Sequence, residues 1–148
     1  MNHNNSLKLS QQLCHPIYIT ANALTRLYKP LLEPLGLTYP QYLIMMALWE
    51  EDGINLNSVS ERTFFDSGTL TPLIKKLQKN GLIKIEVDKK DRRSKILFLT
   101  TKGHHLKSLA SAIPKTLSCL VPFTKVELQS FLKMARSLHK TLLEAEKK

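Results

Sequence analysis

The chain has 148 residues, with 22 Lys and Arg against 12 Asp and Glu, which gives a formal net charge of +10 at pH 7. This length suits one domain with a real hydrophobic core, and the positive charge favours an anionic partner such as nucleic acid. The first ten residues lack the apolar segment of a signal peptide, and no apolar run approaches the roughly 20 residues that cross a bilayer, so a cytoplasmic protein without membrane contact is expected.

The first two predicted elements are helices. Residues from about 17 to 32 place apolar side chains on one face, and Pro34 with Gly36 ends that segment. The second helix opens at Thr38, whose pairing with Gln41 three residues later matches a capping box, and it continues through an apolar run.

A short helix and a longer one come next and form a predicted helix-turn-helix. Ser58 with Glu61 repeats the capping pattern before the short helix. Ser67 is the predicted N-cap of the longer helix, and Gly81 ends it. The longer helix has one apolar stripe with the spacing i, i+3, i+4 and i+7, made of Leu70, Leu73, Ile74 and Leu77. The opposite face of this helix is left for a partner.

Two β-prone runs at 83–87 and 96–99 flank a polar turn at 88–94, which predicts a β-hairpin with a cationic tip. Residues 75–102 contain ten Lys or Arg and three acidic residues. A Lys/Arg turn taken alone is usually a solvated loop, but here a helix, a glycine stop and a hairpin occur in the order of a winged helix-turn-helix. Positive charge on a helix and an adjacent wing suits a DNA phosphate backbone.

After the hairpin the chain is again helical. One helix is marked by apolar residues between 106 and 120, with a kink predicted at Pro114, and the last runs from about 128 to 142 with Thr124 and Glu127 as its capping box. These helices have more apolar surface than a small winged domain can cover. We expect them and the first helix to pair with a second copy of the chain, as two-fold DNA readers do, although they could instead fold back on their own domain.

The groove chemistry of DNA assigns roles to the exposed polar residues of this region. Hydroxyl and cationic side chains early in a recognition helix reach base edges, later lysines reach phosphates, and arginines on a wing enter the minor groove. The predicted major-groove residues are Ser67, Thr69, Thr71 and Lys75, the phosphate ligands are Lys76 and Lys79, and the minor-groove residue is Arg92 or Arg93.

Cys14 is the candidate reactive thiol. Pro16 suits the first turn of a helix, so Cys14 should lie beside a helix N-terminus, whose positive end favours a thiolate that attacks peroxides. Cys119 is a second redox candidate, with a simple packing role as the alternative. The five histidines lack the spacing of metal ligands, and the chain has no glycine-rich phosphate loop, so no metal or cofactor is expected. A thiol peroxidase would have no use for a basic wing.

The complete pattern resembles the MarR family of bacterial transcription regulators, and in particular its organic hydroperoxide resistance branch of the two-cysteine type. The motifs that carry the resemblance are Leu13-Cys14, Tyr18, residues 27–32, residues 37–43 and residues 66–72. His15-Pro16 departs from the apolar or aromatic pair that usually follows the cysteine. The resemblance implies a mainly α fold with a small β-hairpin wing, in a dimeric MarR-like winged helix-turn-helix architecture.

The resemblance also implies a domain organisation and a switch. The chain, residues 1–148, would be one domain, with a DNA-binding lobe at about 38–100 and a helical dimerisation region at about 8–35 and 101–146. It would be a repressor that binds double-stranded operator DNA as a homodimer and releases it when an organic hydroperoxide oxidises the protein. Alternatives of the same family are a regulator released by a small aromatic or anionic ligand, and a broader redox-responsive global regulator.

Particular residues take roles from the resemblance. Tyr28 and Tyr39 should hydrogen-bond the reacting sulfur of Cys14, one of them from the other subunit, with Tyr18 nearby. The sulfenic acid on Cys14 would then condense with Cys119 of the partner to give an intersubunit disulfide. On the wing, the resemblance favours Arg93 for the minor groove, with Asp91 as its orienting residue.

Overall fold

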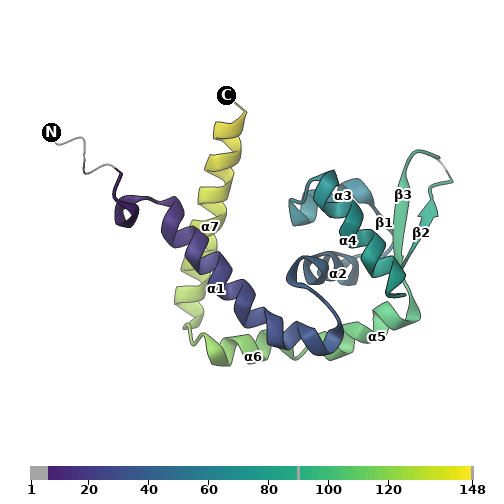
Figure 1. Cartoon of the computed structure of the whole chain (residues 1–148), viewed down its shortest axis with the longest axis horizontal. Coiled ribbons are helices and arrows are strands. Elements are labelled where there is room, and N and C mark those ends of the chain that lie inside the picture. Colours follow the sequence, from purple (N-terminus) through teal and green to yellow (C-terminus); the bar gives the residue numbers. More distant parts are fainter. Residues whose placement is uncertain (1–6, 90, 148) are drawn as a thin grey trace. The chain divides into compact units, whose positions relative to one another are not determined.

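The computed structural model describes residues 7–89 and 91–147 (Figure 1). Lys90 of the predicted wing tip and residues 1–6 of the polar N-terminus lie outside the described residues. Two short 3-10 turns occupy Leu9–Gln11 and Glu33–Leu35. The helices and strands are α1 (Cys14–Leu32), α2 (Tyr39–Glu50), β1 (Ile54–Asn55), α3 (Leu56–Thr63), α4 (Ser67–Lys79), β2 (Ile83–Val87), β3 (Lys95–Leu99), α5 (Thr101–Ala110), α6 (Ile113–Leu120) and α7 (Lys125–Glu146).

The chain divides into two compact units, one ending at Ile113 and the other beginning at Pro114. The first unit holds the hydrophobic core, which is built from α2, α4 and the sheet together with Leu32 of α1, Val59 of α3, and Leu106 and Ala110 of α5. Its fully buried side chains include Ile44, Met45, Leu48, Val59, Leu70, Leu77, Ile83 and Leu97. No helix in the described parts of the chain is both long and apolar enough to cross a membrane.

Helix α2 is the central helix of this core. Pro40 stands in its first turn, and the Thr38 backbone N–H donates to Gln41 Oε1 at 2.9 Å, as the predicted capping box requires. Gln41, Tyr42 and Leu48 are among its six buried residues, so this helix is covered on most of its faces. Burial on several sides explains why its sequence is an almost continuous apolar run rather than a stripe.

Helices α3 and α4 form the predicted helix-turn-helix, but both begin at a different cap. Asn55 caps α3 by accepting the Ser58 N–H at 2.9 Å, so Ser58 lies inside the helix and is not its cap. Asp66 caps α4 in the same way, accepting the Thr69 N–H at 2.9 Å, and Ser67 is the first helical residue. In each case the cap is the residue whose side-chain oxygen reaches the backbone N–H three positions later.

The wing is the hairpin of β2 and β3, and a third strand joins it. The sheet is antiparallel with the order β1-β3-β2, and Leu97 of β3 stands opposite both Ile54 of β1 and Ile85 of β2. The buried Leu97 side chain thus anchors the base of the wing in the core. Strand β1 was not predicted, because two residues are too few to show an alternating pattern.

The segment after the wing contains a helix break where a kink was predicted. Helix α5 ends at Ala110 and α6 begins at Ile113, which makes Pro114 the second residue of α6. A proline in the first turn of a helix loses no hydrogen bond, so it starts a new helix more easily than it bends an old one. Helix α7 has the predicted capping box, with the Thr124 N–H donating to Glu127 Oε2 at 2.9 Å.

Both units expose large apolar side chains. Helix α7 buries no residue within the single chain. Its exposed apolar residues include Val126, Phe131 and Met134, and α1 exposes Ile17, Ile19 and Leu24. Amphipathic helices with uncovered apolar faces are typical of a chain that associates with another. The prediction of a mainly helical winged helix-turn-helix fold is therefore confirmed, and the pairing of these helices with a second copy stays a prediction.

Candidate functional site

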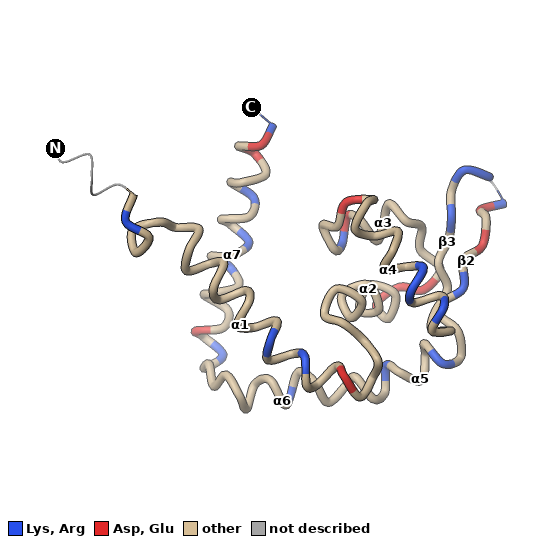
Figure 2. Tube along the Cα trace, in the orientation of Figure 1, with Lys and Arg blue, Asp and Glu red and all other residues tan. Residues whose placement is uncertain are grey.

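The exposed face of α4 is polar and then basic along the chain. Leu70, Ile74 and Leu77 are buried and Leu73 is half-buried, so the polar side chains of the helix face outward. The predicted DNA-binding residues of this helix, namely Ser67, Thr69, Thr71, Lys75, Lys76 and Lys79, are all exposed. Figure 2 shows Lys and Arg along α4 and again on the neighbouring wing. The structure thus presents the six residues together on one accessible helix.

Two hydroxyls of α4 already make hydrogen bonds within the helix. Thr69 Oγ1 donates to Asp66 Oδ2 at 2.8 Å, and Thr71 Oγ1 donates to the Ser67 carbonyl at 2.7 Å. With the hydroxyl proton used in this way, each oxygen keeps lone pairs that accept hydrogen bonds. These threonines therefore suit base edges that donate, such as the amino groups of cytosine and adenine.

Acid is expected to loosen the start of α4. Backbone and side-chain hydrogen bonds from Thr69 hold the pKa of Asp66 below its usual value. A carboxyl with a lowered folded pKa stabilises the fold above its unfolded pKa of about 3.9, and this contribution disappears as the pH falls through the folded pKa. Urea unfolding between about pH 6 and pH 3 should show this loss.

The Asp66→Asn variant is the matched control for this measurement. Asparagine caps a helix about as well as aspartate but does not titrate. Its unfolding free energy should therefore fall less steeply in acid than that of the wild type. If the unfolding free energies of the two proteins fall equally steeply with pH, Asp66 is not the source of the acid sensitivity.

The wing tip places Asp91, Arg92 and Arg93 at the surface. Asp91 Oδ1 accepts the backbone N–H of Arg93 at 3.0 Å, and the Ser94 N–H donates to the Asp91 carbonyl at 2.8 Å. Asp91 therefore shapes the backbone of the turn that carries Arg93, rather than holding its guanidinium. Both arginine side chains remain exposed at the end of the wing.

Cys14 is the first residue of α1, and its thiol is exposed. This agrees with the prediction that the thiol lies at a helix N-terminus, and Pro16 stands in the first turn as expected. Tyr18 follows Cys14 by one helical turn on the same face of α1 and is 68% exposed. Cys119 belongs to α6 in the second unit and is also exposed.

The other two predicted tyrosines form a ring pair. The ring centroids of Tyr28 and Tyr39 are 4.8 Å apart, and Tyr42 lies against Tyr28 at 5.9 Å. Burial raises the pKa of Tyr28, and Tyr39 and Tyr42 raise it further, while burial also raises the pKa of Tyr39. These phenols therefore stay protonated at neutral pH and remain hydrogen-bond donors.

A single chain keeps Cys14 apart from this tyrosine pair. The rise of an α-helix places Tyr28 about 21 Å along α1 from Cys14. Because Tyr39 packs directly on Tyr28, it is far from the sulfur as well. The structure thus groups Tyr28 with Tyr39 and groups Cys14 with Tyr18, at the two ends of one helix.

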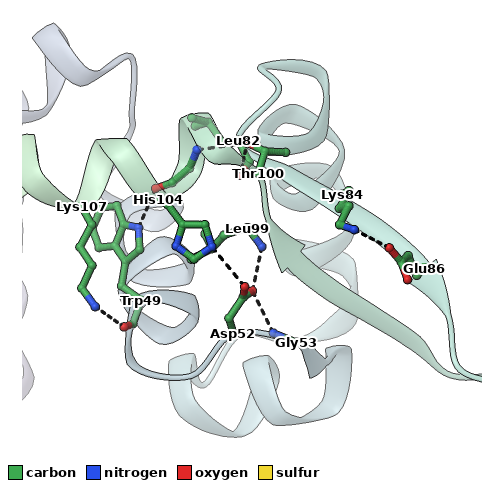
Figure 3. A network of polar contacts seen from close by, with 11 residues as sticks. Trp49, Asp52, Gly53, Leu82, Lys84, Glu86, Leu99, Thr100, His104 and Lys107 are labelled. Carbon is green, nitrogen blue, oxygen red and sulfur yellow. Dashed lines mark hydrogen bonds and ion pairs between the residues drawn. The ribbon is translucent and has the colours of Figure 1, made fainter.

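Two further residues of the first unit were missed by sequence reasoning. Tyr42 was placed in an apolar run and in the motif at 37–43 without a role of its own, yet its ring contacts Tyr28. Asp52 gave no local signal, but its Oδ1 accepts the N–H groups of Gly53 at 2.9 Å and Leu99 at 2.8 Å, and its Oδ2 lies 3.4 Å from Nε2 of His104 (Figure 3). This carboxylate joins the turn after α2 to β3 and α5.

The family model and the relatives that match this chain are transcriptional regulators. A family model described as transcriptional regulator SarA/Rot matches residues 26–109, which is more than half of the chain. The organic hydroperoxide resistance transcriptional regulator of Bacillus subtilis (strain 168) is 39% identical over 138 residues, covering 93% of this chain and 91% of that protein.

Solved structures of AbfR from Staphylococcus epidermidis are similar along nearly the whole chain. Reduced AbfR bound to DNA matches with a TM-score of 0.81 at 30% identity, covering 98% of this chain and 99% of that one. The disulfide-formed structure of AbfR matches with a TM-score of 0.67 at 29% identity, covering 94% and 96%. Similarity in sequence and similarity in fold therefore lead to the same group of proteins.

Proposed function

Because this chain belongs to the SarA/Rot and MarR family of winged-helix transcriptional regulators, we propose that it is a repressor that senses organic hydroperoxides through Cys14. It binds operator DNA as a homodimer in the cytoplasm and releases it after oxidation. The family consists of regulators rather than enzymes, so a thiol peroxidase is set aside. The relative in Bacillus subtilis is named for organic hydroperoxide resistance, which supports this choice of effector.

The observation that carries the proposal is the separation of Cys14 from a half-buried pair of phenol donors. The sulfur lies at the start of α1, and Tyr28 and Tyr39 lie together about 21 Å away near its other end. In a dimer whose α1 helices run in opposite directions, each Cys14 meets the tyrosine pair of the partner. Both tyrosines would then come from the other subunit, whereas the resemblance suggested one.

The first chemical step is a two-electron oxidation of sulfur. The Cys14 thiolate attacks the terminal peroxide oxygen of ROOH, so that an S–O bond forms while the O–O bond breaks. The leaving alkoxide takes a proton and departs as the alcohol ROH, and the sulfur becomes a sulfenic acid. Tyr28 and Tyr39, which stay protonated, donate hydrogen bonds to the peroxide or to the sulfur oxygen.

The second step joins the subunits. The thiolate of Cys119 from the partner attacks the sulfenic sulfur of Cys14, the S–S bond forms, and hydroxide leaves and is protonated to water. Both thiols are exposed and free in the single chain. The existence of a disulfide-formed structure of AbfR supports a disulfide as the oxidised state.

A direct test uses purified reduced protein and a selected duplex, which is a DNA of about 30 base pairs recovered from a random library by binding. One equivalent of cumene hydroperoxide should release the duplex and produce a covalent dimer on a non-reducing gel. Cys119→Ser should abolish the covalent dimer. A covalent dimer in that variant would contradict the assignment of Cys119, and an unchanged complex in the wild type would contradict the proposed sensor.

Arg93→Ala is expected to weaken binding to all duplexes and to flatten the salt dependence. Loss of one phosphate-neutralising cation should reduce the slope of log K against log salt by about one. Arg92→Ala is the matched variant, because it removes the same charge from the adjacent exposed position. The slope is measured by fluorescence anisotropy at several salt concentrations. If Arg93→Ala leaves the slope of log K against log salt unchanged, the wing does not contact DNA.

A second candidate function is supported by a cavity of about 570 Å³ between α1 and the start of α2. Its lining includes the cations Arg26 and Lys29, the acid Glu33 and the ring of Tyr39. A small aromatic acid would suit two cations beside a ring. A regulator of this second type would respond to its ligand without any reactive cysteine.

A further inference from the structure

Four aromatic rings form a continuous row across α1 and α2. The centroids are 4.8 Å apart for Tyr28 and Tyr39, 5.9 Å for Tyr28 and Tyr42, and 6.0 Å for Tyr42 and Trp49. Aromatic rings at these separations are in direct packing contact. The row begins at the two tyrosines proposed to face the sulfur and ends in the last turn of α2.

Trp49 connects this row to α5 through two hydrogen bonds. Its Nε1–H donates to the Gly103 carbonyl at 3.0 Å, and Lys107 Nζ donates to the Trp49 carbonyl at 2.6 Å. Figure 3 shows Trp49 lying against α5 with both bonds drawn. The side chain and the backbone of one residue are therefore both attached to the same helix.

The start of α5 is in turn fastened to the end of α4 and the base of the wing. The Thr100 hydroxyl donates to the Gly81 carbonyl at 2.6 Å and shares this proton with the Leu82 carbonyl at 3.1 Å. Lys102 Nζ donates to the Asn80 carbonyl at 2.9 Å. A shift of the first turns of α5 would therefore displace the end of the recognition helix and the strand that follows it.

We infer that Trp49 is a positioning residue that couples the oxidation state of Cys14 to the orientation of α4 and the wing. This inference rests on the proposed function. Oxygen added to the sulfur changes the hydrogen bonds of Tyr28 and Tyr39, and their rings must then move. Tyr42 is 4% exposed and packs between Tyr28 and Trp49, so it has no free space in which to absorb that movement. The indole transmits the movement to α5 through its bond to Gly103.

The decisive variant is Trp49→Phe, which keeps an aromatic ring and removes the N–H donor to Gly103. Tyr42→Phe is the matched control, because it also loses one polar group and keeps its ring. For each protein, the dissociation constant of the selected duplex is measured before and after one equivalent of cumene hydroperoxide. The ratio of the two constants reports the coupling between oxidation and DNA release.

The expected ratio for Trp49→Phe is about fivefold smaller than for the wild type, which corresponds to the loss of one hydrogen bond from the coupling. Tyr42→Phe should keep the wild-type ratio. The reduced-state affinity and the rate of Cys14 thiol loss should stay within about twofold in both variants. A purely structural role for Trp49 would weaken the reduced state and leave the ratio unchanged.

The intrinsic tryptophan fluorescence comes from Trp49 alone, because it is the only tryptophan of the chain. Its fluorescence in the DNA-free wild type should change at the same rate as thiol loss, and should stay constant in Cys14→Ser. If the emission does not change during oxidation, the inference is overturned even where the Trp49→Phe protein fails to fold.

The measured ratios distinguish failure of the peroxide sensor from failure of the role of Trp49. A wild-type ratio of one means that peroxide does not release DNA, which overturns the proposed function. A large wild-type ratio that Trp49→Phe reproduces leaves the sensor in place and overturns only the role of Trp49. A melting temperature for Trp49→Phe close to that of the wild type shows that the variant is folded when this comparison is made.

Discussion

Cys14→Ser is expected to bind the selected duplex as tightly as the reduced wild type and to stay bound when cumene hydroperoxide is added. Serine differs from cysteine by one atom and is well tolerated at the start of a helix, so the fold of α1 should persist. Its hydroxyl is not oxidised by peroxide, so no sulfenic acid forms. Where oxidation weakens the wild-type complex by on the order of 100-fold, the variant should change by less than about twofold.

Fluorescence anisotropy of the labelled duplex measures both affinities, and adding benzoate separates the two candidate functions. A Cys14→Ser protein that still releases DNA with peroxide would show that the sulfur of Cys14 is not the sensor. Release of the same variant by benzoate would instead favour the ligand-responsive regulator suggested by the cavity beside Arg26 and Lys29.

Gly103→Ala is expected to lower the free energy of unfolding by about 3 kcal/mol. Gly103 is buried in α5 against Leu82, the residue before β2, and a Cβ atom there would lie 2.1 Å from the Leu82 carbonyl oxygen and 3.2 Å from Leu99 Cδ2. Backbone atoms cannot turn away as a flexible side chain can, so α5 has to move. The cost exceeds the roughly 1 kcal/mol by which alanine favours a helix over glycine.

Ser108→Ala provides the control for helix propensity in the same helix. Ser108 is exposed, so its replacement should raise stability slightly or leave it unchanged. Urea unfolding followed by circular dichroism compares the two variants. If Gly103→Ala proves as stable as the wild type, the close approach of α5 to Leu82 does not exist in solution. Because Thr100 and Lys102 fasten the start of α5 to the end of α4 and the base of the wing, a shift of α5 in this variant should lower affinity for DNA together with stability.

The helix-turn-helix and the wing could be predicted because their signals are local. The stripe from Leu70 to Leu77 has the period of a helix, Gly81 takes the left-handed backbone conformation that ends one, and the alternation through Ile83 and Ile85 has the period of a strand. Such patterns depend only on neighbours within a few residues. They predicted the fold class and the order of the two helices and the hairpin correctly.

Finer features depended on geometry that the pattern does not contain. Asp66 and Ser67 are both good capping residues, and only the backbone path decides that the Asp66 oxygen reaches the Thr69 N–H. The bond from Trp49 to Gly103 joins residues 54 positions apart, and no local signal connects them. Tyr42 looked like core and is core, but its contact with Tyr28 required the placement of α1 on α2.

The length of α1 predicts how dimers made of two different variants should behave. Since Cys14 and the Tyr28–Tyr39 pair stand at opposite ends of one helix, a chain without its cysteine still supplies intact tyrosines, and a chain without its tyrosines still supplies an intact cysteine. Two individually insensitive proteins, Cys14→Ser and a Tyr28→Phe, Tyr39→Phe double variant, should therefore form mixed dimers that contain one complete sensor. Such subunit complementation would make peroxide sensitivity a property of the pair and not of either gene product alone.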